Sequence, residues 1–299
     1  MMMKYLSLRL TILILLALPL LRSSGVQAQI SREKPNKKLI KRIQATKGFL
    51  ALWKFDELPG QDRKAIGAGN FPLKEMAGEI PRSNEGPLSG FSLQLDGDKF
   101  LSLTNAQTKE LNLYGPQQGV TVLAWVKWSG QHNAFVGGMW NEYQDGGKRQ
   151  YGLFVSLPYY NGMSRVCGHI SNTGRPTPPF PYSIDYSTSK QEVPKEVWTC
   201  VAMTYDGQRI KSFVNGVFLS SEPELIDHTK GFEGYPDGLV QQKNPYAFPD
   251  GMGNNGSDFT VGAVLLKRGM GNFFKGLIGG LAVYDRALTD SEIEALSLR

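Results

Sequence analysis

The sequence predicts an all-β protein, an antiparallel two-sheet sandwich that ends in a short helix. Two segments near the end of the chain carry this prediction, and the composition agrees with it. A hydrophobic content of 41%, with 34 Gly and 17 Pro, suits many short strands joined by tight turns. One sandwich domain accounts for most of the 299 residues, because sandwiches of roughly 200–250 residues routinely form a single domain.

Residues 198–219 predict three consecutive strands. An alternating apolar run breaks at Asp206-Gly207, resumes for a few residues and breaks again at Asn215-Gly216. Both pairs are typical of tight hairpin turns, which need positive φ angles. The segment therefore predicts an antiparallel meander.

Residues 276–296 predict a last strand and a terminal helix. The strand contains Gly279-Gly280 and ends at Tyr284. Thr289 and Glu292 have the Thr-x-x-Glu spacing of a capping box. We expect a short helix over residues 291–296.

In this order and spacing, the two segments resemble the LamG-like jelly-roll family of the concanavalin A-like lectin/glucanase superfamily. The similar positions are Trp198, Val201, Ala202, Thr204–Gly207, Asn215, Gly216, Gly276, Ile278, Val283, Tyr284, Arg286–Thr289, Glu292 and Ile293. Leu52–Glu57, Leu95–Gly97 and Val120–Lys127 also look like the family. The resemblance covers about residues 49–296 and implies a jelly-roll sandwich, but a fold of this kind does not by itself specify a function.

Residues 1–28 have the pattern of a signal peptide. Lys4 and Arg9 precede an apolar run from Leu10 to Leu21, and Val26-Gln27-Ala28 is a small-x-small cleavage site. The apolar run is too short to span a bilayer. We expect cleavage near Ala28 and export to the periplasm or the cell exterior.

The formal charge of +6 belongs to the beginning of the chain. Residues 1–47 contain ten basic residues and one acidic residue, whereas residues 48–299 contain 23 basic and 26 acidic ones. A nucleic-acid groove in the predicted domain at 48–299 is therefore not supported. We expect the basic segment 29–47 to be a solvated linker or a short frayed helix, with attraction to an anionic surface as the alternative.

Cys167 and Cys200 are the only cysteines. A period of two places Cys167 on the strand face opposite Val166 and Ile170, and the strand order of the family implies that the two cysteine-bearing strands are neighbours. Because disulfides persist in exported proteins, we expect a Cys167–Cys200 disulfide. Two buried free thiols are the alternative.

No catalytic motif is visible in the sequence. Retaining glycosidases need two carboxyl groups about 5 Å apart, and the Glu-x-Asp-x-x-Glu strand of jelly-roll glucanases is missing. His132, His169 and His228 have no nucleophile motif nearby. These observations argue against an enzyme, although carboxylates from distant strands can converge.

The resemblance also implies a structural calcium. The candidate ligands are Asp56, Glu57, Asp96 and Asp98, since calcium prefers oxygen ligands. Asp before Gly is equally common in turns without metal. In addition, Gly279-Gly280 stands where many relatives have Asp-Glu.

Three long segments, 139–151, 175–186 and 235–251, are rich in aromatic residues. Connections of this length tend to be functional or disordered, and a sugar site needs aromatic platforms beside polar groups. The candidate ligand-binding residues are Trp140, Asn141, Glu142, Tyr143, Arg149, Tyr159, Tyr160, Tyr182, Tyr186 and Tyr246. The alternative is that these aromatic side chains only pack the loops onto the sandwich.

Together these observations predict an exported, non-catalytic, carbohydrate-binding module. A glycoside hydrolase or polysaccharide lyase with scattered carboxylates is one alternative. A cell-surface module that binds another protein is a further one.

Overall fold

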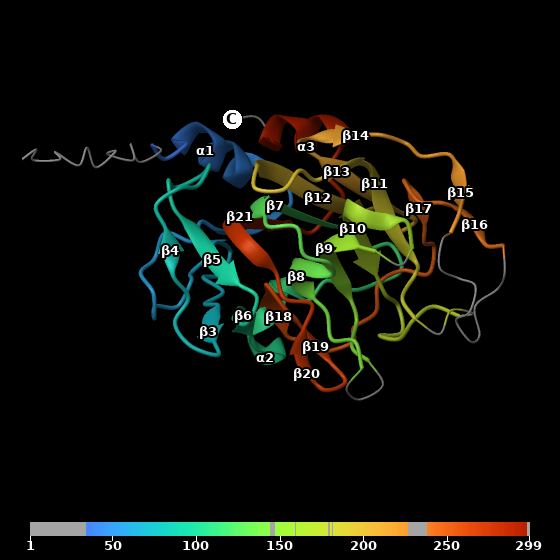
Figure 1. The fold of residues 1–299 in the computed structure, drawn as a ribbon, viewed down its shortest axis with the longest axis horizontal. Coiled ribbons are helices and arrows are strands. Elements are labelled where there is room, and N and C mark those ends of the chain that lie inside the picture. Colours follow the sequence, from blue (N-terminus) through green and yellow to red (C-terminus); the bar gives the residue numbers. More distant parts are fainter. Residues whose placement is uncertain are drawn as a thin grey trace, which may run out of the picture. The chain divides into compact units, whose positions relative to one another are not determined.

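The computed structural model describes residues 34–143, 147–158, 160–178, 180, 182–226 and 238–297, and the structural statements below concern these residues. The segment expected to be a signal peptide lies outside them. Two antiparallel β-sheets dominate the described part (Figure 1), which confirms the all-β jelly-roll prediction.

The larger sheet has ten strands, with β14–β13–β12–β7–β21–β1–β2 as its main order and β5, β4 and β17 attached. These strands are β1 (Phe49–Trp53), β2 (Ile66–Gly67), β4 (Arg82–Ser83), β5 (Ser92–Asp96), β7 (Val120–Trp128), β12 (Trp198–Tyr205), β13 (Arg209–Val214), β14 (Val217–Phe218), β17 (Tyr246–Ala247) and β21 (Lys275–Tyr284).

The smaller sheet has seven strands in the order β11–β10–β9–β8–β18–β6–β3. They are β3 (Lys74–Met76), β6 (Phe100–Leu103), β8 (Ala134–Met139), β9 (Tyr151–Leu157), β10 (Gly162–Ile170), β11 (Tyr186–Glu192) and β18 (Phe259–Val261). Two hairpins stand apart, β15 (Pro223–Leu225) with β16 (Val240–Gln242) and β19 (Val264–Leu266) with β20 (Gly269–Gly271). The helical segments are α1 (Lys37–Ala45), α2 (Asn105–Thr108), the 3₁₀ turn η1 (Lys109–Leu111) and α3 (Asp290–Ser297).

The main core lies between the two sheets, because the strands alternate in what they bury. In β7, Val122 and Val126 belong to this core, whereas Leu123 and Trp125 belong to a second cluster on the outer side of the larger sheet. This is the side-chain period of two expected of strands. Each sheet therefore has an inner face in the core and an outer face that needs its own cover.

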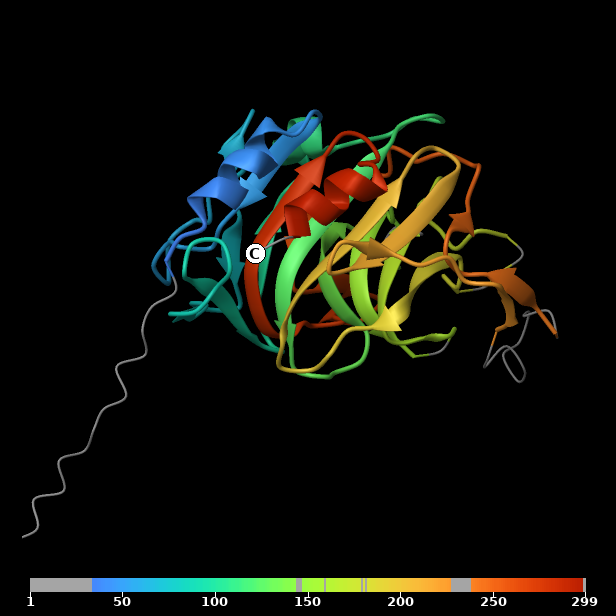
Figure 2. The same ribbon diagram turned by 90° about the horizontal axis from the view of Figure 1, so that it is seen from above.

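Two helices cover the outer face of the larger sheet. α1 contributes Leu39 and Ile43 to the cluster on this face, and α3 contributes Ile293 and Leu296. The two helices lie side by side across the strands (Figure 2). We call this surface the helix-covered face.

Part of the basic segment, for which a solvated linker or a short helix was expected, forms the helix α1 (Lys37–Ala45). Asn36 caps α1, since its Oδ1 accepts a hydrogen bond from the backbone N–H of Leu39 at 3.0 Å. Arg42 donates from Nη1 to the carbonyl oxygen of Ala295 at 2.7 Å, which joins α1 to α3. The lysines of α1 remain exposed.

The meander and the capping box form as the sequence predicts. β12 pairs with β13, and β13 pairs with β14, across the turns at Gly207 and Gly216, whose φ angles are +92° and +82°. The Thr289 N–H donates to Glu292 Oε2 at 2.8 Å, and the Glu292 N–H donates to Thr289 Oγ1 at 3.3 Å. These reciprocal bonds start α3.

The expected disulfide is wrong. Cys167 lies on β10 in the smaller sheet and Cys200 on β12 in the larger sheet, and both thiols are free and buried. Each belongs to a different outer-face cluster, so the core separates them. The error arose from strand order, because the chain crosses from one sheet to the other between the two cysteines.

Candidate functional site

The outer face of the smaller sheet is covered by loops and by the β19–β20 hairpin, and this cover leaves a pocket. A buried cluster on this face includes Phe135, Trp140, Phe154 and Tyr186. The pocket above it has a volume of about 320 Å³, within the range of small-molecule sites. Its lining residues are Asn133, Glu142, Tyr143, Arg149, Phe154, Leu157, Tyr160, His169, Tyr182, Ser183, Tyr186, Leu266 and Asn272. We call this surface the pocket face.

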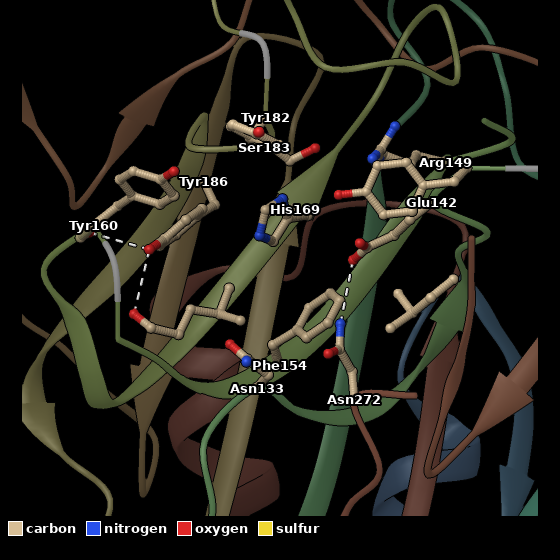
Figure 3. Close-up of a pocket in the computed structure, with 13 residues that line it drawn as sticks. Asn133, Glu142, Arg149, Phe154, Tyr160, His169, Tyr182, Ser183, Tyr186 and Asn272 are labelled. Carbon is tan, nitrogen blue, oxygen red and sulfur yellow. Dashed lines mark hydrogen bonds between the residues drawn. The ribbon is translucent and has the colours of Figure 1, made fainter. Parts of the chain in front are cut away.

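Three neighbouring strands provide the floor of the pocket. Phe154 comes from β9, His169 from β10 and Tyr186 from β11, and Figure 3 shows them side by side. His169 and Tyr186 occupy directly paired positions, with ring centroids 4.6 Å apart. The ring of His169 also lies 5.2 Å from that of Phe154 and 4.9 Å from that of Trp140. The histidine is therefore surrounded by aromatic rings.

His169 is held neutral by its surroundings. Burial lowers the pKa of its imidazole well below the usual value, and the nearby charges of Lys243 and Arg149 lower this pKa further. Its Nδ1 is buried and has no hydrogen-bond partner within the described structure. A neutral imidazole has one donor and one acceptor nitrogen, so His169 contributes an uncharged polar group to the pocket lining.

Glu142 forms one wall and is fixed by two neutral donors. Its Oε1 accepts a hydrogen bond from Asn272 Nδ2 at 3.3 Å (Figure 3). The same atom accepts one from Trp140 Nε1, also at 3.3 Å. Burial raises the pKa of this carboxyl group, while the charge of Arg149 and the bond from Trp140 lower it in part. Trp140 is buried behind the pocket and holds Glu142 in place through this hydrogen bond.

Arg149 lies beside Glu142 in the pocket lining, and its Nε is buried without a hydrogen-bond partner in the described structure. Its Nη1 donates to the carbonyl oxygen of Gly174 at 3.2 Å, and its Cζ lies 5.2 Å from the ring centroid of Tyr143. Only 1% of the residue is exposed. Burial lowers the pKa of Arg149, and the charges of Glu142, Tyr143 and Asp185 oppose that change.

A second pair of ionisable groups lies beneath the floor. Lys243 is fully buried, donates from Nζ to the carbonyl oxygen of Ile184 at 2.9 Å and lies 3.8 Å from the ring centroid of Tyr186. Burial lowers its pKa to about 7. Burial also raises the pKa of Asp185 to about 6.

The candidate aromatic residues divide by exposure. Tyr143 and Tyr182 stand at the mouth of the pocket and are 41% and 45% exposed. Tyr160 and Tyr186 line the pocket but are largely buried, and Tyr186 donates its hydroxyl to the carbonyl oxygen of Tyr160 at 3.1 Å. Flat rings available to a ligand are therefore at the mouth.

Some predicted residues lie elsewhere. Tyr246 belongs to the core between the sheets, on β17. Asn141 borders a separate hollow of about 330 Å³, together with Trp140 and Lys148. Tyr159 lies outside the described residues. For every residue in the predicted set, ligand binding itself stays a prediction.

Several lining residues were missed by the sequence analysis. His169 could have been found, because a period of two places a lone histidine on the outer face of β10 beside Cys167. Asn133 and Asn272 had no such signal. They belong to turns, and only the packing of the loops brings these turns to the pocket.

The four predicted calcium ligands do not form a fitting donor set. Asp56 pairs with Lys54 at 2.5 Å, and Glu57 Oε1 accepts a hydrogen bond from the Lys64 N–H at 2.9 Å. Within the described ranges, no three His, Cys, Asp or Glu side chains gather at one point.

Gly279-Gly280 has a packing explanation. A Cβ at Gly280 would lie 2.4 Å from a methyl carbon of Leu88, and one at Gly279 would lie 2.7 Å from Pro87 Cδ. The pair therefore permits the segment around Leu88 to pack closely on β21.

Comparison with known proteins agrees with the fold. Residues 95–233 match a family model described as the concanavalin A-like lectin/glucanases superfamily, which confirms the resemblance over that segment. No curated protein sequence gives a significant match. Among the described residues, no helix has the length and apolar character that a membrane crossing requires.

Three solved structures illustrate the likeness. Domain 4 of AbnA, an extracellular arabinanase from Geobacillus stearothermophilus solved with arabinotriose, has a TM-score of 0.50 at 16% identity and covers 84% of this chain and 98% of its own. Trypanosoma rangeli sialidase with sialic acid has a TM-score of 0.49 at 13% identity, covering 88% and 37%.

The CBM40 domain of Ruminococcus gnavus IT-sialidase, bound to α2,3-sialyllactose, has a TM-score of 0.46 at 16% identity, covering 69% and 95%. This chain thus spans little more than a third of the trypanosomal sialidase. At these identities the likeness concerns the fold alone.

Proposed function

We propose that this protein binds carbohydrate in the pocket of its pocket face. The chain forms a jelly-roll sandwich, and its residues 95–233 match a family model of the concanavalin A-like lectin/glucanase superfamily. The observation that carries the proposal is the combination of an aromatic floor, exposed tyrosines at the mouth and convergent polar groups. The arabinanase domain of the same fold was solved with an arabinose trisaccharide, which supports this class of ligand.

The chemistry of the lining suits a sugar ring. Tyr143 and Tyr182 expose flat rings that can pack against the C–H face of a sugar. His169, Ser183 and Asn133 supply neutral hydrogen-bonding groups for hydroxyls. An apolar pocket with a few directed polar groups is the usual form of a small-molecule site.

We assign the pocket to binding rather than to hydrolysis. Hydrolysis by the common mechanism needs two carboxyl groups on either side of the scissile bond, and Glu142 is the one carboxylate among the described residues that line the pocket. The proposal includes export, on the sequence pattern of residues 1–28.

The test is a glycan array, followed by calorimetry with the best ligand for the purified mature chain. We expect Tyr182→Ala to weaken binding about tenfold, which corresponds to ~1.4 kcal/mol, because the aromatic platform is lost. Tyr114→Ala is the matched control, since Tyr114 is 53% exposed and does not line the pocket. Both variants should melt near the wild-type temperature.

Two results would count against the proposal. One is the absence of binding to any glycan on the array. The other is an equal effect of Tyr182→Ala and Tyr114→Ala on affinity. Release of reducing sugar from a polysaccharide panel would favour hydrolysis instead.

A further inference from the structure

Acidic and basic groups are equal in number around the pocket. Glu142 and Arg149 line it, and Asp185 and Lys243 lie just behind its floor. His169 is also ionisable, but burial lowers its pKa and keeps the imidazole neutral. Two carboxyl groups therefore stand opposite two basic groups.

The basic groups are partly engaged within the protein. Arginine binds carboxylates best through its two-pronged fork of N–H groups, but Nη1 of Arg149 is taken by the carbonyl oxygen of Gly174, and its Nε is buried. Lys243 donates to the carbonyl oxygen of Ile184 and is covered by the ring of Tyr186. An entering carboxylate would therefore find the fork of Arg149 already occupied at Nη1 and Lys243 covered.

Glu142 is the carboxyl group held in the pocket wall. Burial raises its pKa, whereas the charge of Arg149 and the hydrogen bond from Trp140 lower this pKa and so favour the ionised form. Glu142 is fixed by Trp140 and Asn272, so its carboxylate cannot turn away from a ligand without losing both hydrogen bonds. A second carboxylate brought close to it would be repelled, and in a partly buried site that repulsion is weakly screened.

We infer that the pocket selects uncharged sugars over their carboxylated counterparts, with Glu142 as the residue that determines this selectivity. The inference rests on the proposed function and specifies its ligand class. Desolvation of an unpaired carboxylate costs free energy, whereas a neutral sugar hydroxyl can bond to the uncharged side chains of the lining, such as Asn133 and Ser183, without that cost.

The experiment uses matched ligands that differ by one carboxylate. Affinities of the mature chain are measured at pH 7 for neutral hexose oligomers and for hexuronic acid oligomers of the same linkage and length. We expect the wild type to bind the neutral member at least about tenfold more tightly, which is ~1.4 kcal/mol.

Glu142→Gln then tests the assigned residue. Glutamine keeps an oxygen that can accept from Trp140 and Asn272, but it removes the negative charge. We expect the preference for the neutral member to fall several-fold or to reverse. Glu110→Gln is the control, since Glu110 is exposed on η1 and does not line the pocket, and it should keep the wild-type ratio.

The outcomes are distinguishable. Tighter wild-type binding of the hexuronic members would overturn the inference and leave the proposed function standing. If folded Glu142→Gln keeps the wild-type ratio of the two affinities, Glu142 does not determine the selectivity, and the inference is overturned. Absence of binding to both members of every pair would overturn the proposed function and the inference together.

Discussion

The outer faces of the two sheets are covered by different kinds of structure. The helix-covered face buries Leu123 and Trp125 of β7 under α1 and α3, whose apolar side chains complete the cluster. The pocket face is covered by loops, and these loops bring ionisable groups into the interior. Helices satisfy their own backbone and can seal a sheet with apolar side chains, whereas a loop must satisfy its backbone with other groups.

Burial of charge follows this division. Within the described ranges, the buried Asp, Glu, Lys, Arg and His side chains at the pocket face are Arg149, His169, Asp185 and Lys243. Arg63 lies elsewhere and pairs with Glu75. We infer that the helix-covered face contributes chiefly stability, while the pocket face gives up some stability for a polar site.

The largest expected effect comes from the helix-covered face. Ile293 of α3 is fully buried there, so Ile293→Ala should lower the free energy of unfolding by about 2–5 kcal/mol through lost burial and a cavity. Sugar affinity should not change at temperatures where the variant is folded. Urea denaturation and calorimetry measure the two quantities.

Glu294→Ala is the control for this change, because Glu294 is exposed on the same helix and its removal should cost little. If folded Ile293→Ala loses sugar affinity, the two faces are coupled and the division of roles is wrong.

The next effect concerns the buried charge of the pocket face. Lys243 has a pKa of about 7 in the folded state against 10.5 when exposed. Between these values the unfolded chain holds a proton that the folded chain has released, so stability from this group rises with pH. The free energy of unfolding of the wild type minus that of Lys243→Met should therefore rise by up to ~1.4 kcal/mol per pH unit between pH 7 and 10.

Denaturation at several pH values measures this difference. Lys74→Met is the control, because Lys74 is exposed on β3 and water solvates its ammonium group in both states. A difference for Lys243→Met that stays flat over this pH range would show that the folded protein accommodates the charge.

The sequence predicts the local features of both faces. Turn pairs such as Asn215-Gly216 and the capping box at Thr289 are local signals, and the structure contains both. The long aromatic loops were also recognised, and Glu142 and Tyr182 from separate loops do line one pocket.

Long-range relations were not predictable in this way. The period of two identified the outward side of Cys167 but not which sheet its strand joins, and the disulfide prediction failed for that reason. Nothing in the local sequence around Lys243, which lies between Gln242 and Asn244, indicates that this lysine is buried. Its burial depends on where Tyr186 and Ile184 lie in space, and local patterns carry no such information.

The smallest expected effect tests how the helical cover begins. Thr289 Oγ1 accepts from the Glu292 N–H at 3.3 Å, in the first turn of α3. Thr289→Ala removes this cap and should lower the free energy of unfolding by about 1 kcal/mol, with sugar affinity unchanged. Thr289→Ser keeps the hydroxyl group and should stay within a few tenths of a kcal/mol of the wild type. Equal losses in the two variants would mean that the threonine methyl group, and not the capping hydroxyl, stabilises this end of α3. An affinity loss in Thr289→Ala would instead connect the helix-covered face to the pocket, which is the result that most directly contradicts a division of roles between the two faces.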